Sequence, residues 1–159
     1  MQYLTWRRLT AVGLASAVLA WLVTAALDRS GATPMSVPWT FDAVCVAAGV
    51  ATLVFGWQVR QYREGNRPSL DGLRAARTAV LAQATAYVGV IIAGASAGYA
   101  LGLMGDWGHE PRREVIISAL IAAVAALLMM AAGIVAERWC RHGRDSDDDP
   151  PQVPSAEPA

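Results

Sequence analysis

The stretch AVLAQATAYVGVIIAGASAGYALGLM, residues 79–104, decides the fold. These 26 residues include no Asp, Glu, Lys, Arg or His. A transmembrane helix needs about 20 mostly apolar residues to cross a hydrocarbon core of about 30 Å, and lipid cannot satisfy the hydrogen bonds of irregular backbone. The stretch therefore predicts a membrane-spanning helix. At about 1.5 Å per residue it is about 39 Å long, so it has to tilt or project from the bilayer.

Three further stretches have the same character, namely residues 9–27, 39–59 and 115–136, and Asp42 is the one charged residue within them. The whole chain is 55% hydrophobic and 16% charged, with no net charge, whereas an ordinary soluble domain is about 25% charged. This composition argues against a soluble domain and against a nucleic-acid-binding protein. We expect an all-α integral membrane protein, with four transmembrane helices in an up-down bundle over residues 1–140. Residues 141–159 are polar, acidic and proline-rich, which predicts a disordered cytoplasmic tail.

The arginines predict how the helices are oriented. Ten of the 13 lie before residue 9, within residues 60–78 or after residue 136. Because basic residues are enriched on the cytoplasmic side, we expect both termini in the cytoplasm and the protein in the plasma membrane. Arg7 and Arg8 before an apolar run also fit a signal peptide. That run is longer than the usual 7–15 or so residues, so we expect it to be a retained anchor, with cleavage as the alternative.

Small residues on the third span predict close helix packing. Residues four apart share one helix face, and small side chains let another backbone approach. A ladder of Gly94, Gly98 and Gly102 has this spacing, and Gly89, Ala93 and Ala97 run beside it. We expect this face to pack within the chain. The alternative is a homo-oligomer, or contact with another membrane protein through the third helix.

Charged groups gather at the predicted cytoplasmic end. Glu137 lies at the depth of Arg74 and Arg77, so we expect an ion pair between Glu137 and one of them, with a hydrated interfacial carboxylate as the alternative. Gln83, about one turn further inside, is expected to hydrogen-bond a neighbouring helix. Five arginines are expected to contact membrane lipid headgroups or a partner protein: Arg60, Arg63, Arg67, Arg74 and Arg77.

The sequence offers little for catalysis. It has no nucleophile elbow, zinc-binding motif or phosphate-binding loop. Cys45 and Cys140 fall at opposite ends of the predicted bundle, too far apart for a disulfide. Asp106, His109 and Glu110 make a poor cation site in a loop. We therefore expect no catalytic residue, no cofactor and no metal.

Three segments carry a family resemblance. LDGLRAARTAVLAQA over residues 70–84, GASAGY over 94–99 and ERWCR over 137–141 resemble an actinobacterial family of small membrane proteins, domain of unknown function thirty-one-eighty. The likeness extends from the first span to Arg141. It implies a four-span fold and a gene often placed beside folate-biosynthesis genes. The family has no established activity, so the resemblance implies no catalytic residues.

These observations lead to three functional hypotheses. The first is a non-enzymatic accessory or assembly protein that acts through the third helix and the arginine-rich cytoplasmic loop. The second is a small-molecule transport or permeation component, for which a water-filled cavity lined by Gln83, Tyr87, Ser96 and Tyr99 is expected. The third is an enzyme that uses Glu137 and Cys140 at the inner face.

Overall fold

The structure, a computed structural model, describes residues 6–31, 33–63, 72–106, 108 and 110–141. Within the helices, the side chains of residues 62–63, 72–76, 106 and 140–141 are outside the description. The fold is all-helical and confirms the predicted class, because four helices are long and apolar enough to cross a membrane. They are α1 (Trp6–Arg29), α2 (Trp39–Arg63), α3 (Gly72–Leu103) and α4 (Glu110–Arg141), and the short 3-10 helix η1 (Met104–Asp106) follows α3. The predicted tail lies outside the described residues from residue 142 onward.

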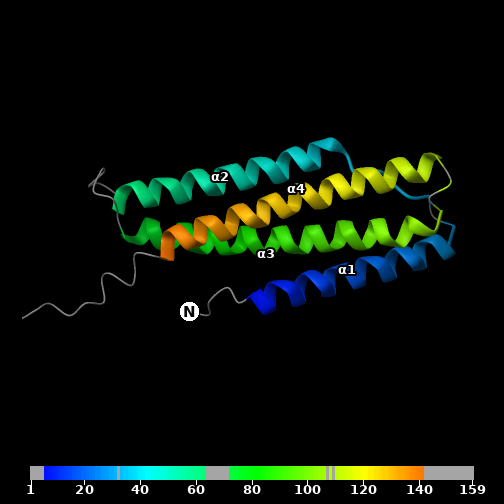
Figure 1. The fold of residues 1–159 in the computed structure, drawn as a ribbon, viewed down its shortest axis with the longest axis horizontal. Coiled ribbons are helices and arrows are strands. Elements are labelled where there is room, and N and C mark those ends of the chain that lie inside the picture. The colour runs from blue at the N-terminus through cyan, green and yellow to red at the C-terminus, as the bar shows by residue number, and fades with distance from the viewer. Residues whose placement is uncertain (1–5, 32, 64–71, 107, 109, 142–159) are drawn as a thin grey trace, which may run out of the picture.

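The helices alternate in direction, as an up-down bundle requires (Figure 1). The antiparallel helices α3 and α4 pack together in the middle, α1 flanks α3, and α2 packs against α4 and more lightly against α3. Helices that follow each other in sequence are therefore not all neighbours, since α1 mainly contacts α3, to which it is parallel, and α2 mainly contacts α4, to which it is parallel. We call the end where α1 finishes the Asp28 end and the opposite end the Glu137 end. At the Glu137 end, α1 begins well short of the other three helices.

The predicted glycine ladder packs within the chain, against α1. A Cβ atom on Gly94 would overlap the Ser16 hydroxyl and the Gly13 carbonyl, and one on Gly98 would overlap the Ala17 carbonyl. A Cβ on Gly102 would approach Thr24 to 2.8 Å. The backbones of α1 and α3 thus come close enough for extensive van der Waals contact, which holds helices together where water is absent. The face carrying the ladder is covered by α1.

Gly89 does not belong to that contact, because it faces α4. A Cβ on Gly89 would lie 2.7 Å from the Met130 nitrogen, and a Cβ on Gly133 would lie 2.7 Å from the Ala86 nitrogen. The two glycines therefore make reciprocal contacts that bring α3 and α4 together. Helix α2 also packs closely on α4, since a Cβ on Gly49 would lie 3.3 Å from the Met129 Cα and one on Gly56 would lie 2.9 Å from the Ala136 Cβ. Sequence reasoning did not single out Gly49, Gly56 or Gly133.

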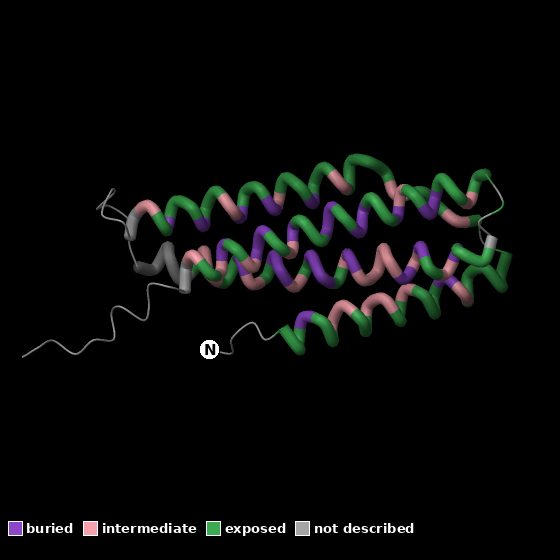
Figure 2. The backbone as a smooth tube through the Cα atoms, in the orientation of Figure 1, coloured by how far each residue is buried: buried purple, intermediate pink, exposed green. Residues whose placement is uncertain are grey.

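The core is built of small side chains. Figure 2 shows the buried positions running along the facing sides of α3 and α4, while α1 is mostly half-buried or exposed. Among the described residues, Ile116 is the one large side chain that is fully buried. The predicted packing residues Ala93 and Ala97 are buried and half-buried, respectively. Most of the remaining buried positions on the two central helices are alanines, including Ala82, Ala86, Ala100, Ala119, Ala122, Ala123, Ala125, Ala126, Ala132 and Ala136.

Helix α1 ends at a glycine cap. The Gly31 N–H donates to the Asp28 carbonyl at 3.1 Å, and Gly31 has a φ of 77°. This left-handed conformation closes a helix end and suits glycine because it has no Cβ. The chain then crosses the Asp28 end of the bundle to start α2 on its far side.

Candidate functional site

The Asp28 end holds a cavity of about 400 Å³. The last turn of α1, the α1–α2 connection and the end of α3 form its walls. Most of the lining is apolar, and Asp28 is the one charged residue among its described members. The lining residues are Thr24, Leu27, Asp28, Thr33, Pro34, Met35, Val37, Tyr99 and Leu103. This volume falls in the range of about 300–1,000 Å³ that is typical of small-molecule sites.

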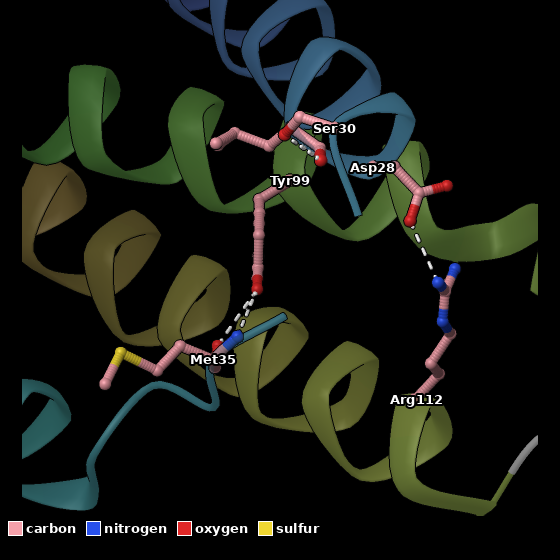
Figure 3. A network of polar contacts seen from close by, with 6 residues as sticks. Asp28, Ser30, Met35, Tyr99 and Arg112 are labelled. Atoms are coloured by element: carbon pink, nitrogen blue, oxygen red, sulfur yellow. Dashed lines mark hydrogen bonds and ion pairs between the residues drawn. The ribbon is translucent and has the colours of Figure 1, made fainter. Parts of the chain in front are cut away.

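The α1–α2 connection is tied down over this end by hydroxyl groups from the central helices. The Tyr99 hydroxyl accepts a hydrogen bond from the Met35 N–H and donates one to the Met35 carbonyl, both at 3.0 Å (Figure 3). Further along, the Val37 N–H donates to the Ser118 hydroxyl at 3.2 Å. The α1–α2 connection is thereby held to both α3 and α4, and it forms the outer wall of the cavity.

An ion pair joins α1 to α4 at the mouth of the cavity. The Arg112 guanidinium donates to Asp28 Oδ1 at 2.9 Å (Figure 3), and the two side chains are 27% and 38% exposed. Because both partners are partly hydrated, the pair contributes little to stability, on the order of 0.2–1 kcal/mol. Its structural effect is to fix the position of the Asp28 carboxylate beside the cavity.

The Glu137 end carries a polar contact between α3 and α4. Gln83 Nε2 donates to Glu137 Oε1 at 3.1 Å, which confirms the expected bond from Gln83 to a neighbouring helix. Among the described side chains Glu137 makes no ion pair with Arg77, which is exposed. The alternative partner, Arg74, has its side chain outside the described set. Cα–Cβ bonds tilt toward a helix's N-terminus, so the side chains of Gln83 and Glu137 on antiparallel helices point toward each other.

Two tryptophans and an arginine lie beside this contact. The rings of Trp57 and Trp139 meet edge to face with centroids 6.0 Å apart. The Arg60 guanidinium lies 5.9 Å from the Trp139 ring centroid, within the range of a cation–π contact. Aromatic and basic side chains of this kind are typical of a membrane–water boundary. Of the other arginines expected to meet headgroups, Arg77 is exposed, Arg67 lies outside the described residues, and the side chains of Arg63 and Arg74 are not described.

Along α2, the residues Thr52 and Cys45 and one oxygen of Asp42 are buried. The hydroxyls of Thr52 and Thr85 lie 3.1 Å apart and also contact the carbonyls of Ala48 and Leu81. The two hydroxyl groups have two protons between them, so they share these protons among the three contacts. Cys45 is buried with a free thiol, while the Cys140 side chain is outside the described set. One turn before Cys45, the Asp42 Oδ1 atom is buried without a hydrogen-bond partner among the described residues.

Comparison with known proteins places the chain in a family. The DUF3180 family, described as a protein of unknown function, matches residues 9–143. The chain belongs to the DUF3180 family. The match covers all four helices apart from the first residues of α1. No curated protein and no solved structure matches the chain.

The DUF3180 description carries no chemistry, so the arrangement of side chains has to indicate it. Within the described part of the chain, no group of three or more His, Cys, Asp or Glu residues could hold a metal ion. Of the four residues expected to line a permeation cavity, Tyr99 lines the cavity at the Asp28 end, whereas Gln83 binds Glu137 at the opposite end. What the described part of this DUF3180 chain offers is a closely packed helical frame, a small apolar cavity at the Asp28 end and outward-facing helix surfaces.

Proposed function

We propose that this protein is a non-enzymatic accessory or assembly protein of the plasma membrane, with both termini in the cytoplasm, and that it binds another membrane protein through α2. The observation that carries the proposal is a ladder of exposed alanines on α2, Ala43, Ala47 and Ala51, at four-residue spacing. We call this surface the α2 alanine face. Small residues at this spacing are typical of helix–helix interfaces in membranes, because they let a second backbone come close.

The outward surfaces of the central helices differ from the α2 alanine face. Exposed positions on α3 and α4 carry mostly large side chains suited to contact with lipid, including Val80, Val88, Ile91, Leu101, Leu120, Ile121, Val124, Leu127 and Leu128. The glycines of these helices are already used within the chain, since Gly98 meets α1 and Gly133 meets α3. This is why we assign the partner surface to α2 instead of the α3 ladder that the sequence suggested. Of the arginine-rich loop over residues 60–78, residues 64–71 lie outside the described residues.

The proposal is tested by affinity purification from native membranes in mild detergent. We expect one membrane protein, or a differently tagged second copy of the chain, to co-elute in stoichiometric amount. Ala47→Leu adds bulk at the centre of the α2 alanine face without entering the core, because Ala47 is exposed. It should lower the amount of co-eluting partner about tenfold, which corresponds to about 1.4 kcal/mol of binding free energy.

Ala131→Leu is the matched control, because it makes the same change at an exposed alanine of α4. It should leave both the partner and the thermal unfolding midpoint unchanged. The proposal is wrong if no defined partner co-elutes with the unmodified protein, or if Ala47→Leu and Ala131→Leu retain it equally.

A permeation component is the second candidate, and the cavity at the Asp28 end favours it. That cavity is lined by Tyr99 but by none of Gln83, Tyr87 and Ser96, and the α3–α4 seam beyond it is filled by alanine and glycine. A continuous path would therefore need the helices to separate. Flux of a small solute into proteoliposomes that contain only this protein, above the rate in protein-free vesicles, would favour this second function.

A further inference from the structure

The chemistry of the cavity at the Asp28 end indicates a ligand, which would be a binding role separate from the proposed binding of a partner protein. We infer that it binds a lipophilic ammonium compound, whose apolar chain fills the cavity and whose ammonium group meets the Asp28 carboxylate at the mouth. Such a compound has two sources, a free lipophilic amine and the ethanolamine headgroup of a membrane lipid. They share the same chemistry, and the experiment below distinguishes them.

The interior of the cavity suits an apolar chain. Two of its polar side chains are already engaged within the protein, since the Thr24 hydroxyl donates to the Ala20 carbonyl at 2.8 Å and the Tyr99 hydroxyl binds Met35. Thr24 turns its methyl group toward Gly102. What remains for a ligand are the side chains of Leu27, Val37 and Leu103. A sugar or a polyanion placed here would lose its hydration without gaining hydrogen bonds, which costs free energy.

The mouth of the cavity suits a positive head. Asp28 and Thr33 are exposed lining residues, and Arg112 occupies Oδ1 of Asp28. A carboxylate has about four acceptor positions, so Asp28 retains capacity for another donor. A hydrogen bond between charged groups is about twice as strong as a neutral one. An ammonium group therefore gains more at this place than a hydroxyl of the same size.

The outer wall of the cavity can adapt to the chain. Met35 lies on this wall and is 84% exposed as a residue, while its backbone is held by the Tyr99 hydroxyl. Methionine has a flexible, polarizable side chain that fits apolar surfaces of varied shape. Because the backbone is held and the methionine side chain is flexible, the cavity can accept alkyl chains of different length without rearrangement of the helices.

The position of the cavity also matches an amphiphile. Leu103 is the last residue of α3, and Leu27 and Asp28 lie in the last turn of α1. The cavity thus opens where the apolar spans end. A chain that lies in the cavity stays at the depth of the hydrocarbon, and its head stays at the depth of the headgroups.

The test uses the full chain in phosphatidylcholine nanodiscs and decylamine that carries a photoactivatable diazirine on its alkyl chain. Labelled peptides are identified by mass spectrometry. We expect saturable labelling confined to peptides that contain Leu27, Met35 or Leu103. Unlabelled decylamine should compete, whereas decanoate should not. Asp28→Asn, which can still accept a hydrogen bond from Arg112, should weaken decylamine binding about tenfold through loss of a charge-assisted hydrogen bond.

A pair of tryptophan variants separates cavity binding from lipid-like partitioning. Leu27→Trp fills the cavity, while Leu22→Trp makes the same change on α1 at a residue outside the lining, and the two leucines are 49% and 52% exposed. Saturable labelling should disappear in Leu27→Trp and persist in Leu22→Trp, with equal unfolding midpoints. Competition by phosphatidylethanolamine added to the discs identifies the lipid headgroup as the source, and its absence identifies a free amine.

The inference is overturned by unsaturable labelling spread over the lipid-facing side of α1, by equal labelling of the two tryptophan variants, or by competition from decanoate as strong as that from decylamine. None of these outcomes depends on the α2 alanine face. Failure of the ligand site therefore leaves the proposed partner role standing, and loss of the partner role leaves the ligand site standing.

Discussion

At the scale of single residues, two aspartates differ in how their carboxylates are satisfied. Asp42 Oδ1 is buried without a partner among the described residues, while Asp28 binds Arg112. An unsatisfied buried polar group costs about 1–3 kcal/mol, which exceeds the 0.3–1 kcal/mol or so that a carboxylate gains in a helix's first turn. We expect Asp42→Ala to stabilise the fold by about 1 kcal/mol.

Asp28→Ala serves as the comparison, because it removes a satisfied carboxylate. It should lower the free energy of unfolding by roughly 0.2–1 kcal/mol. Thermal unfolding of both variants and the unmodified protein in one detergent measures the difference. A lower unfolding midpoint for Asp42→Ala would contradict the expectation and would indicate that the carboxylate has a partner when the protein is in a membrane.

The hydrogen bond between Gln83 and Glu137 makes a second prediction at this scale. In a double-mutant cycle with Gln83→Leu and Glu137→Ala, we expect a coupling free energy of about 0.6 kcal/mol, the average for polar contacts between membrane helices. The measurement is the free energy of unfolding in a denaturing-detergent titration. A parallel cycle with Arg77→Gln and Glu137→Ala should be additive within about 0.3 kcal/mol, and coupling in that cycle would restore the ion pair that the sequence suggested.

Sequence reasoning predicted the depth of these residues along their helices, but it did not determine which side chains contact each other. The depth of Gln83, Arg77 and Glu137 follows from counting residues along uncharged spans. The choice of partner depends on rotation, because Gln83 lies beside Ala82 on the side of α3 that faces α4. Nothing in the local sequence predicts that the Tyr99 hydroxyl binds the Met35 backbone, because that contact depends on where a loop crosses the bundle.

At the scale of helices, the approach of α1 to α3 depends on glycine. A Cβ on Gly98 would overlap the Ala17 carbonyl, and the nearby backbone leaves little room for adjustment. Gly98→Ala should therefore lower the free energy of unfolding by about 1–3 kcal/mol, the usual cost of overpacking. Gly105→Ala is the control, since nothing lies within 4 Å of the added methyl group, and its effect should stay within about 0.5 kcal/mol. Equal unfolding curves for the two variants would show that α1 does not need this contact.

The periodicity that revealed the ladder shows which face of α3 is small but not which helix covers it. The sequence did not predict that the glycines at positions 49, 56 and 133 lie at helix contacts, because they do not recur at four-residue spacing. The four spans were predictable because their length and apolar composition can be read directly along the sequence. The pairing of parallel helices, α1 with α3 and α2 with α4, is a three-dimensional property that the order of spans does not determine.

At the scale of the whole molecule, the distribution of arginines predicts which end faces the cytoplasm. We expect the Asp28 end outside and the Glu137 end inside. In a background with Cys45→Ala and Cys140→Ser, a membrane-impermeant maleimide added to intact cells should label Ser30→Cys and should label Arg60→Cys only after permeabilisation. Both original residues are exposed. Labelling in the reverse order would mean that the protein is inserted the other way.

Because α1 begins short of the other helices at the Glu137 end, the protein has unequal thickness there, with a consequence for the surrounding bilayer. Ala17 lies level with Gly98, because the two residues are in contact. Fewer residues separate Ala17 from the start of α1 at Trp6 than separate Gly98 from the start of α3 at Gly72. At 1.5 Å per residue, this difference makes α3 extend about 22 Å further than α1. Arg7 and Arg8 lie near the start of α1 and are exposed. Their guanidinium groups are more stable when they are hydrated than when they lie in hydrocarbon. We therefore expect the leaflet beside α1 to be thinner than the leaflet beside α3. Mismatch energies of fractions of a kcal/mol per Å would then favour membranes in which one leaflet is thin or curved.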